Sequence, residues 1–406
     1  MKKLLIVLSA LVAASLLPAG ARSDGGDFEI CWDGLKKVCP GAYGRVHPLA
    51  DGRLMVAYNR DSSIFARFSP DEGESWSEEV SVMSKFTHFN PQRKESVRVL
   101  CTRPDFAQLP NGDILCTVTL RPAGYKTWIH AECIYSTISK DGGKTWSERI
   151  ETYPSMVWEY TGDEKIMKGA MESSVLVLPD GRVQVYFTDN TPYYRKYLDG
   201  RRDSSAGNNI SYVESTDGGQ TWSGAHIVCN ADAGGSIGWD CMPVLTLCDG
   251  YIWLIIEHKD ERGAKNAMEL MMMSCKADEG WPAQFISKYS DRRFYPYEPD
   301  RDVYCGAPYI THTDDYILVC GQCAEGTPTP LSDKYSRPWI HCVPRSAVSG
   351  GKFNATYAAP PAVPLEANPK GGALWNALCD IGGNRFILTT QYKGCIWINK
   401  GSIVKK

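Results

Sequence analysis

One hairpin pattern recurs six times along this chain of 406 residues, and it limits the folds open to the sequence. Each copy has a polar or small residue, an apolar run, a tight turn and a second apolar run. The copies begin at residues 44, 102, 170, 240, 306 and 373, so they are spaced by 58 to 70 residues. Apolar runs joined by Asp-Gly, Asn-Gly or Gly-Gly indicate β-hairpins. A repeat of this length indicates the blades of a β-propeller. The sequence therefore predicts an all-β protein with six blades.

A shorter phrase follows several of the hairpins. It reads "SPDEGESW" at 69–76, "SKDGGKTW" at 139–146 and "STDGGQTW" at 215–222, with a degenerate copy, "KADEGW", at 276–281. The Asp side chain can accept hydrogen bonds from the backbone N–H groups of a turn, and Gly supplies a positive φ. The Trp is expected to tuck beneath the turn and pack on the blade. Calcium binding would need oxygen ligands that the phrase lacks. The phrase therefore predicts a structural turn.

The N-terminal residues have the pattern of a signal peptide. Lys2 and Lys3 precede an apolar stretch, and Ala19-Gly20-Ala21 forms a small-residue cleavage site. We expect residues 1–21 to be removed and the protein to be periplasmic or secreted, without a membrane anchor. No break in composition divides residues 22–406, which are expected to form a single catalytic propeller domain. The segment "DFEICW" at 27–32 is expected to add a strand to the last blade and close the ring.

The net charge and the cysteine content bear on which ligands the protein can bind and on whether it forms disulfides. A net charge of −3 argues against nucleic acid, which requires a concentrated basic face. Fifteen cysteines in an exported chain permit disulfides, and Cys31 and Cys39, which flank a short loop, are a plausible pair. Cysteines inside apolar runs are expected to act as small buried hydrophobic residues. Neither a metal ion nor an organic cofactor is implied.

The first residues of the six hairpins are the candidate binding residues. In a propeller the innermost strands surround a central channel, so these residues line one of its mouths. Aromatic faces can stack on sugar rings, and charged groups can fix hydroxyl groups. A polysaccharide or oligosaccharide is therefore the expected partner, bound by Arg45, His47, Arg103, Asp105, Trp239, Asp240, Tyr309, Trp375 and Asn376. His47 could line the mouth, but a histidine that precedes a proline in a strand is more often a core residue.

Two glutamates are the candidate catalytic residues. Glu172 stands in "GAMESSVLVLPDG", just ahead of an apolar inner strand, and Glu257 ends the apolar run "YIWLIIE". A charged side chain beside a buried strand is costly unless it faces an open cavity. Glycoside hydrolysis needs two carboxyl groups across the scissile bond, one protonated and one ionised. The sequence therefore predicts that Glu172 and Glu257 form this pair, with either one as the nucleophile.

The repeated phrase on a six-bladed propeller resembles the Asp-box of the sialidase superfamily. True sialidases are similar to this chain through Arg45 in "RVHP" and Glu172 in "ESSVLVLPDG". In that family the Glu activates a tyrosine nucleophile, and three arginines clamp a carboxylate. One of these arginines is usually at the end of the hairpin that begins with the Glu, where this chain has Thr188 and Asp189.

The chain resembles the exo-arabinanases of the same superfamily more closely. The resemblance covers four blades: the Glu that opens the third hairpin, "MPVLTL" with "IWLIIE", "GAPYI", and "LWNALCDI" with "GCIWINKGSI". It implies Glu172 and Glu257 as the catalytic pair, although Met171 and Ser173 differ from the apolar and proline neighbours of that family. The prediction is an exported, retaining exo-glycosidase that releases terminal sugar units. An exo-α-sialidase is the alternative, and a non-catalytic carbohydrate-binding propeller is the second alternative.

Overall fold

The computed structural model describes residues 28–90, 94–123, 132–153, 169–189, 208–230, 239–259, 268–297, 302–353, 357–359 and 372–406. Across these ranges the chain forms 25 strands and two 3₁₀ turns, η1 (Asp333–Tyr335) and η2 (Arg345–Ala347). No helix among the described residues is long and apolar enough to cross a membrane. The expected signal peptide, residues 1–21, lies outside the described residues.

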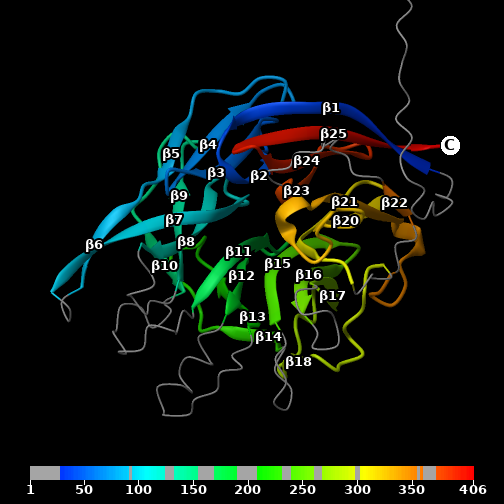
Figure 1. The fold of residues 1–406 in the computed structure, drawn as a ribbon. Coiled ribbons are helices and arrows are strands. Elements are labelled where there is room, and N and C mark those ends of the chain that lie inside the picture. Colours follow the sequence, from blue (N-terminus) through cyan, green and yellow to red (C-terminus); the bar gives the residue numbers. More distant parts are fainter. Residues whose placement is uncertain are drawn as a thin grey trace, which may run out of the picture.

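The strands form six sheets that are arranged around a ring, as predicted (Figure 1). From the innermost strand outwards, the first blade consists of β2 (Ala42–Pro48), β3 (Leu54–Arg60), β4 (Ser63–Ser69) and β5 (Val80–Met83). The second consists of β7 (Glu95–Gln108), β8 (Ile114–Pro122), β9 (Cys133–Ser139) and β10 (Ile150–Tyr153), with β6 (Phe86–Asn90) on the other side of β7. The third consists of β11 (Ala170–Val177), β12 (Val183–Asp189), β13 (Asn209–Ser215), β14 (His226–Asn230) and β18 (Ile286–Ser287).

The remaining three blades follow the same plan. The fourth blade consists of β15 (Trp239–Cys248), β16 (Tyr251–Lys259) and β17 (Glu269–Lys276). The fifth consists of β19 (Cys305–His312), β20 (Tyr316–Cys323), β21 (Arg337–Pro344) and β22 (Tyr357–Ala359). The sixth consists of β23 (Leu374–Asp380), β24 (Arg385–Tyr392), β25 (Cys395–Lys405) and β1 (Phe28–Pro40). The innermost strand of each blade contacts the innermost strands of both neighbouring blades, which closes the ring.

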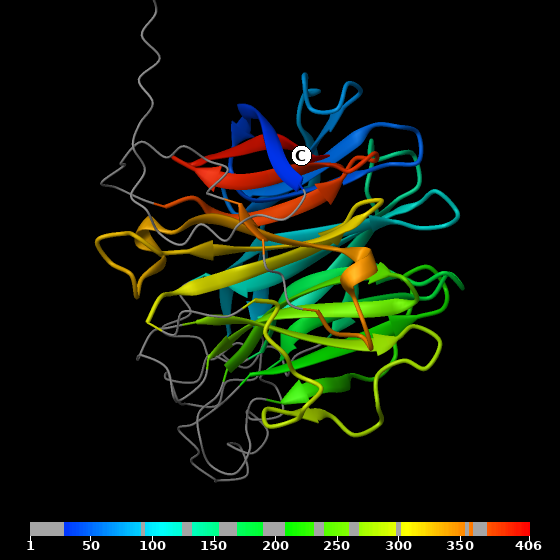
Figure 2. The same ribbon diagram turned by 90° about the vertical axis from the view of Figure 1, so that its right-hand side faces the viewer.

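The two ends of the described chain meet in the last blade. Strand β1 pairs antiparallel with β25, from Phe28 opposite Lys405 to Pro40 opposite Cys395. The first and last strands lie side by side in both views (Figure 1, Figure 2). This arrangement confirms the expected role of the N-terminal segment.

The expected pairing of Cys31 with Cys39 is wrong. Both residues lie on β1, where Cys31 is opposite Ser402 and Cys39 is opposite Ile396. Eight residues of extended strand separate their Cα atoms by on the order of 25 Å. A disulfide requires roughly 4.4–6.8 Å. All fifteen cysteines lie in described segments, and all are free thiols.

The Asp-boxes are the structural turns that the sequence predicted. In the second box, Asp141 accepts hydrogen bonds from the N–H (2.9 Å) and hydroxyl (2.6 Å) of Thr145, and Ser139 Oγ accepts one from the N–H of Gly143 (2.8 Å). The first and third boxes repeat these bonds around Asp71 and Asp217.

Each box also touches the preceding blade of the ring. A Cβ atom built on Gly73, Gly143 or Gly219 would lie 2.6 Å from Ile398, 2.2 Å from Phe68 or 2.9 Å from Leu115, respectively. The glycines therefore permit both the left-handed turn and the close approach of two blades.

Candidate active site

Every innermost strand contains a bulge, which lies near its first residues in all of them except the longer β7. The register with the second strand shifts within 42–45, 102–105, 171–174, 241–244, 306–309 and 374–377. Within each shift one residue other than glycine has a positive φ: Tyr43 (55°), Arg103 (52°), Glu172 (59°), Met242 (52°), Ala307 (46°) and Trp375 (54°). We call these six residues the bulge ring. Such conformations cost of order 1–3 kcal/mol each and are concentrated at functional sites.

The bulge ring brings residues of all six blades together. Tyr43, Met242 and Ala307 pack in one cluster with Cys241, and Trp375 packs against it. The rings of Tyr43 and Trp375 lie 5.5 Å apart, and Arg103 forms an ion pair with Glu172. The bulges therefore direct these side chains to a common mouth of the central channel.

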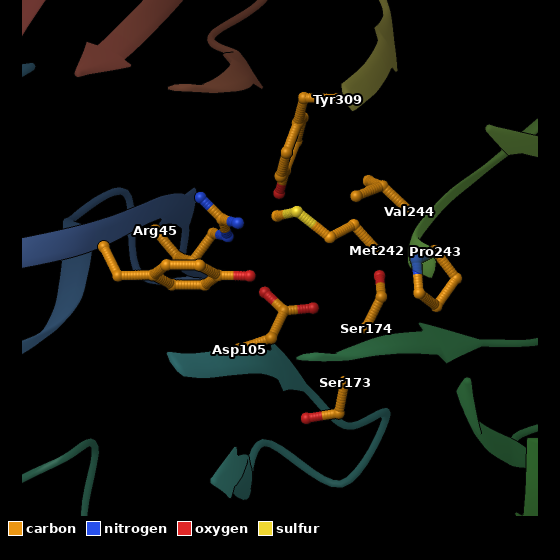
Figure 3. Close-up of a pocket in the computed structure, with 9 residues that line it drawn as sticks. Arg45, Asp105, Ser173, Ser174, Met242, Pro243, Val244 and Tyr309 are labelled. Atoms are coloured by element: carbon orange, nitrogen blue, oxygen red, sulfur yellow. The ribbon is translucent and has the colours of Figure 1, made fainter. Parts of the chain in front are cut away.

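A small polar cavity of about 10 Å³, large enough for roughly one water molecule, lies beside the ring. Arg45, Asp105, Ser174 and Tyr309 line it with Met242, and their polar groups face the same space (Figure 3). The sequence predicted three of these five residues as ligand contacts, but it contained no signal for Ser174 and Met242.

Arg45 is held at this cavity by aromatic rings. Its guanidinium carbon lies 4.1 Å from the centre of the Tyr43 ring and 5.2 Å from that of Tyr309, and only 3% of the residue is exposed. No carboxylate among the described residues is within ion-pair distance of it. Asp105 accepts the backbone N–H of Val175 through Oδ2 (2.9 Å).

His47 joins two of these groups. Its Nε2 lies 3.3 Å from the Tyr309 hydroxyl and 3.6 Å from Asp105 Oδ1. The His47 side chain is 29% exposed and also packs edge-on against Phe106. It therefore belongs both to the mouth and to the packing around it. The structure thus brings together Arg45, His47, Asp105 and Tyr309.

Glu172 lies beside a cation and a hydroxyl group. Its Oε1 is 3.5 Å from Arg103 Nε, and its Oε2 accepts a hydrogen bond from Thr188 Oγ1 (3.4 Å). Thr188 Oγ1 in turn accepts the N–H of Met242 (2.9 Å). Burial raises the pKa of Glu172, and the charge of Arg103 opposes this rise. Thr188 therefore connects Glu172 on the third blade to the backbone of Met242 on the fourth blade.

Two residues that support Arg103 were not identified from the sequence. Glu132 Oε2 lies 2.7 Å from Arg103 Nη1, and Glu132 Oε1 lies 3.1 Å from Arg121 Nε. Arg121 belongs to β8 and Glu132 immediately precedes β9. Because neither residue is near the start of an inner strand, the hairpin repeat does not identify them.

Glu257 occupies a different environment. Its Oε1 accepts a hydrogen bond from the Tyr304 hydroxyl (3.2 Å), and its Oε2 lies 3.4 Å from the thiol of Cys241. Burial and the nearby charge of Glu172 raise the pKa of Glu257 to about 7. The two carboxyl groups therefore share one buried electrostatic environment, with Arg103 paired to Glu172.

Asp240, a predicted substrate contact, lies in a buried ion-pair cluster. Arg293 donates to both of its oxygens (3.0 and 2.7 Å), and His258 Nδ1 lies 2.8 Å from Oδ1. The residue is 0% exposed, and burial alone would raise its pKa, but the charge of Arg293 and the hydrogen bond from His258 outweigh burial and lower it. Full burial separates this carboxylate from any ligand in the mouth, so its role is structural.

The remaining candidates differ in exposure. Trp239 is 41% exposed, and the Lys259 ammonium lies 5.3 Å from its ring centre, so the indole is available at the edge of the fourth blade. Asn376 is 1% exposed, and its amide has no hydrogen-bond partner among the described residues. In the described part of the chain, no group of three His, Cys, Asp or Glu side chains could hold a metal ion.

Comparisons with known proteins agree with this architecture. The model of the BNR/Asp-box repeat matches residues 137–148. None of the curated proteins compared with the chain matches it in sequence. Among solved structures, the GH93 α-L-arabinofuranosidase of Fusarium graminearum, solved with arabinobiose, has a TM-score of 0.60 at 14% identity, over 92% of this chain and 98% of that chain.

Two further structures have the same fold. The α-L-arabinanase of Penicillium chrysogenum, also complexed with arabinobiose, has a TM-score of 0.57 at 14% identity over 91% of this chain and 98% of that chain. The NanB sialidase of Streptococcus pneumoniae has a TM-score of 0.55 at 12% identity over 94% of this chain and 71% of that chain. The chain therefore contains an Asp-box repeat and has the six-bladed propeller fold of these solved structures.

Proposed function

We propose that this protein is an exo-acting glycoside hydrolase that releases terminal sugar units from a polysaccharide or glycan by a retaining mechanism. The observation that carries the proposal is the pair of buried glutamates, Glu172 and Glu257, beside one mouth of the channel. The fold neighbours named above are glycoside hydrolases, which supports the class of reaction. Export through residues 1–21, to the periplasm or outside the cell, and a single catalytic domain at 22–406 belong to the same proposal.

The surroundings of the two glutamates support a division of their roles. Two carboxyl groups that interact in a buried site do not both ionise readily, so one of them retains its proton. Arg103 stabilises the negative charge on Glu172, whereas no cation lies within ion-pair distance of Glu257 among the described residues. Glu172 is therefore the ionised nucleophile, and Glu257 is the acid that protonates the leaving oxygen.

The reaction then follows from these charges. The Glu172 carboxylate attacks the anomeric carbon while Glu257 gives its proton to the departing sugar. Glu257, now ionised, removes a proton from the water that hydrolyses the glycosyl-enzyme. Arg45, His47, Tyr309 and Trp375 would hold the terminal sugar, and the exposed ring of Trp239 would contact the rest of the chain. Arabinose is the first candidate sugar because two fold neighbours were solved with arabinobiose.

The test is hydrolysis of 4-nitrophenyl α-L-arabinofuranoside and of arabino-oligosaccharides, with products followed by chromatography and by proton NMR. Release of units from one end, with retained anomeric configuration in the first product, is expected. Inversion would refute the assignment of Glu172 as the nucleophile. Oligosaccharide binding without any product, in a wider screen of aryl-glycosides, would favour a non-catalytic carbohydrate-binding propeller.

One observation favours a sialidase as the second candidate. Arg45 is a buried cation without a carboxylate partner among the described residues, as expected of a group that binds an acidic sugar. Thr188, however, lies beside Glu172 where that family is expected to have a clamp arginine. We therefore expect little or no release of sialic acid from sialyl-lactose, and efficient release would reverse the ranking of the two candidates.

A further inference from the structure

The start of β19 surrounds the Glu257 carboxylate, and nothing in the sequence analysis gave these residues a role. The Tyr304 hydroxyl donates to Oε1 (3.2 Å), and the backbone N–H of Ala307 helps to lower the pKa of this carboxyl group. A Cβ atom on Gly306 would lie 2.0 Å from Oε1, so only glycine lets the backbone pass this close. The segment 304–307 therefore confines the oxygen Oε1.

Gln322 determines which way the Tyr304 hydroxyl points. The N–H of Trp375 donates to Gln322 Oε1 (3.0 Å), and a backbone N–H can only donate. The amide nitrogen of Gln322 must then face Tyr304, whose oxygen accepts its hydrogen at 3.0 Å. Gln322 is 1% exposed, so water does not compete for these bonds.

The single proton of the Tyr304 hydroxyl is therefore directed at Glu257. The phenol remains protonated, because burial and the charge of Glu257 raise its pKa. If the carboxyl proton of Glu257 were on Oε1, it would clash with the hydrogen that the Tyr304 hydroxyl donates to that oxygen. The proton of the neutral Glu257 is consequently best placed on Oε2, which faces the Cys241 thiol at 3.4 Å rather than another strong donor.

We propose that Tyr304, oriented by Gln322, is a positioning residue that fixes the rotation of Glu257 and places its transferable proton on Oε2. This inference rests on the proposed function of Glu257 as the acid. The chain of bonds runs from Glu257 on the fourth blade through Tyr304 and Gln322 on the fifth to the Trp375 backbone on the sixth. This chain of bonds therefore links the orientation of the Glu257 carboxyl group to Trp375 of the bulge ring.

The experiment compares the wild-type protein with Tyr304→Phe, which removes the hydroxyl and keeps the ring. The hydroxyl stabilises the ionised carboxylate, so its loss raises the pKa of Glu257. We expect kcat/KM to fall about 10–100-fold, as for a lost buried hydrogen bond to a charged group. We also expect the basic limb of the pH profile to move upward by roughly half a pH unit or more.

The matched control is Tyr297→Phe, because the Tyr297 hydroxyl contacts the Cys305 thiol (3.1 Å) instead of Glu257. It should leave the basic limb in place. Gln322→Met should move the limb in the same direction as Tyr304→Phe and should have no further effect in the Tyr304→Phe background, since both changes act through one hydroxyl. An unmoved limb in folded Tyr304→Phe would overturn the inference.

A readout without turnover separates this inference from the proposed function. The carboxyl group of Glu257 can be titrated by infrared difference spectroscopy, with Glu257→Gln identifying its band. If the wild-type protein cleaves no substrate, the proposed function fails, but Tyr304→Phe must still raise the titration midpoint of Glu257. An unchanged midpoint would show that Tyr304 does not position this group.

Discussion

The Asp-box turns and the bulge ring are both repeated around the propeller, and both use positive φ angles, but they do so with opposite chemistry. In the boxes Gly73, Gly143 and Gly219 are left-handed, Glu72 in the first box is left-handed as well, and the polar groups of the turns bond within eight residues of sequence. In the bulge ring the left-handed residues all carry side chains, and their partners come from other blades.

The difference separates a structural repeat from a functional one. The second and third boxes use only glycine where the backbone is left-handed, so they lower the free energy of the fold without stored strain, whereas the first box has Glu72 at one such position. The ring retains strain at six positions, and that strain persists only because the surrounding blades fix it. Changes in the boxes should therefore alter stability, and changes in the ring should alter turnover.

The largest expected effect is on kcat, and it tests Glu172 in the bulge ring together with Glu257 beside it. Glu172→Gln and Glu257→Gln should each lower kcat about 10²–10⁴-fold, because the amide keeps the shape but cannot attack or transfer a proton. The double variant should lose little more than the worse single variant. The melting temperature should stay near that of the wild type. Glu151→Gln, on the outer strand β10, is the control and should change neither quantity.

The pH profile should distinguish the two regions next. Because the pKa of Glu257 is raised to about 7, the protonated acid is the major form below that pH. We expect kcat/KM to fall about tenfold per pH unit above it. Circular dichroism over the same range should show no loss of structure. A profile that stays flat to pH 9 would exclude Glu257 as the acid.

A single methyl group should disrupt a box. Gly143→Ala places a Cβ atom 2.2 Å from Phe68 at a φ of 91°, so we expect a loss of about 1–3 kcal/mol in the free energy of unfolding. The control Gly112→Ala has a similar φ of 89° but no neighbour within 4 Å, which isolates backbone strain from the clash. The kcat of the folded protein should be unchanged in both. A fall in kcat at constant melting temperature would give the box a catalytic role.

Acid should weaken the Asp-box turns. Hydrogen bonds lower the pKa of Asp141 and Asp217 to about 2, below their unfolded values. The stability that they add is present above about pH 4 and is lost as the pH falls toward 2. Asp141→Ala and Asp217→Ala should lower the melting temperature at pH 7, and in these variants it should depend less on pH between 4 and 2. An equal acid dependence in the variants and the wild type would contradict this account.

The smallest expected effect is on the free energy of unfolding, and it tests the strain in the bulge ring. Ala307→Gly removes strain of about 1 kcal/mol and also removes a buried methyl group worth about 0.8 kcal/mol, so the free energy of unfolding should change by less than about 1 kcal/mol. Measurement by urea unfolding would detect a larger change. A loss as large as that of Gly143→Ala would mean that the ring is not strained.

The features that the sequence predicted are local and repeated. Hairpins, box turns and the added N-terminal strand each depend on residues close in sequence or on a fixed period, so the six blades could be predicted. Glu172 and Glu257 were found because a carboxylate beside an apolar strand is conspicuous.

The features that the sequence did not reveal depend on distant partners. Asp240 opens an inner strand as the true mouth residues do, but Arg293, 53 positions later, neutralises it inside the fourth blade. Tyr304 and Gln322 acquire a role only when the fifth blade lies beside Glu257. Tyr43 and Met242 look like ordinary core residues, because the period marks the strands but not the bulge within them.

The bulge ring also bears on how the sugar selectivity of such a protein can be changed. One backbone conformation accepts tyrosine, arginine, glutamate, methionine, alanine and tryptophan at six equivalent positions. Because six different side chains adopt this conformation, we expect the backbone at these positions to tolerate a change of side chain. A combinatorial library at Tyr43, Met242, Ala307 and Trp375, with Arg103 and Glu172 kept, should yield folded proteins with altered sugar selectivity and no inserted or deleted loops.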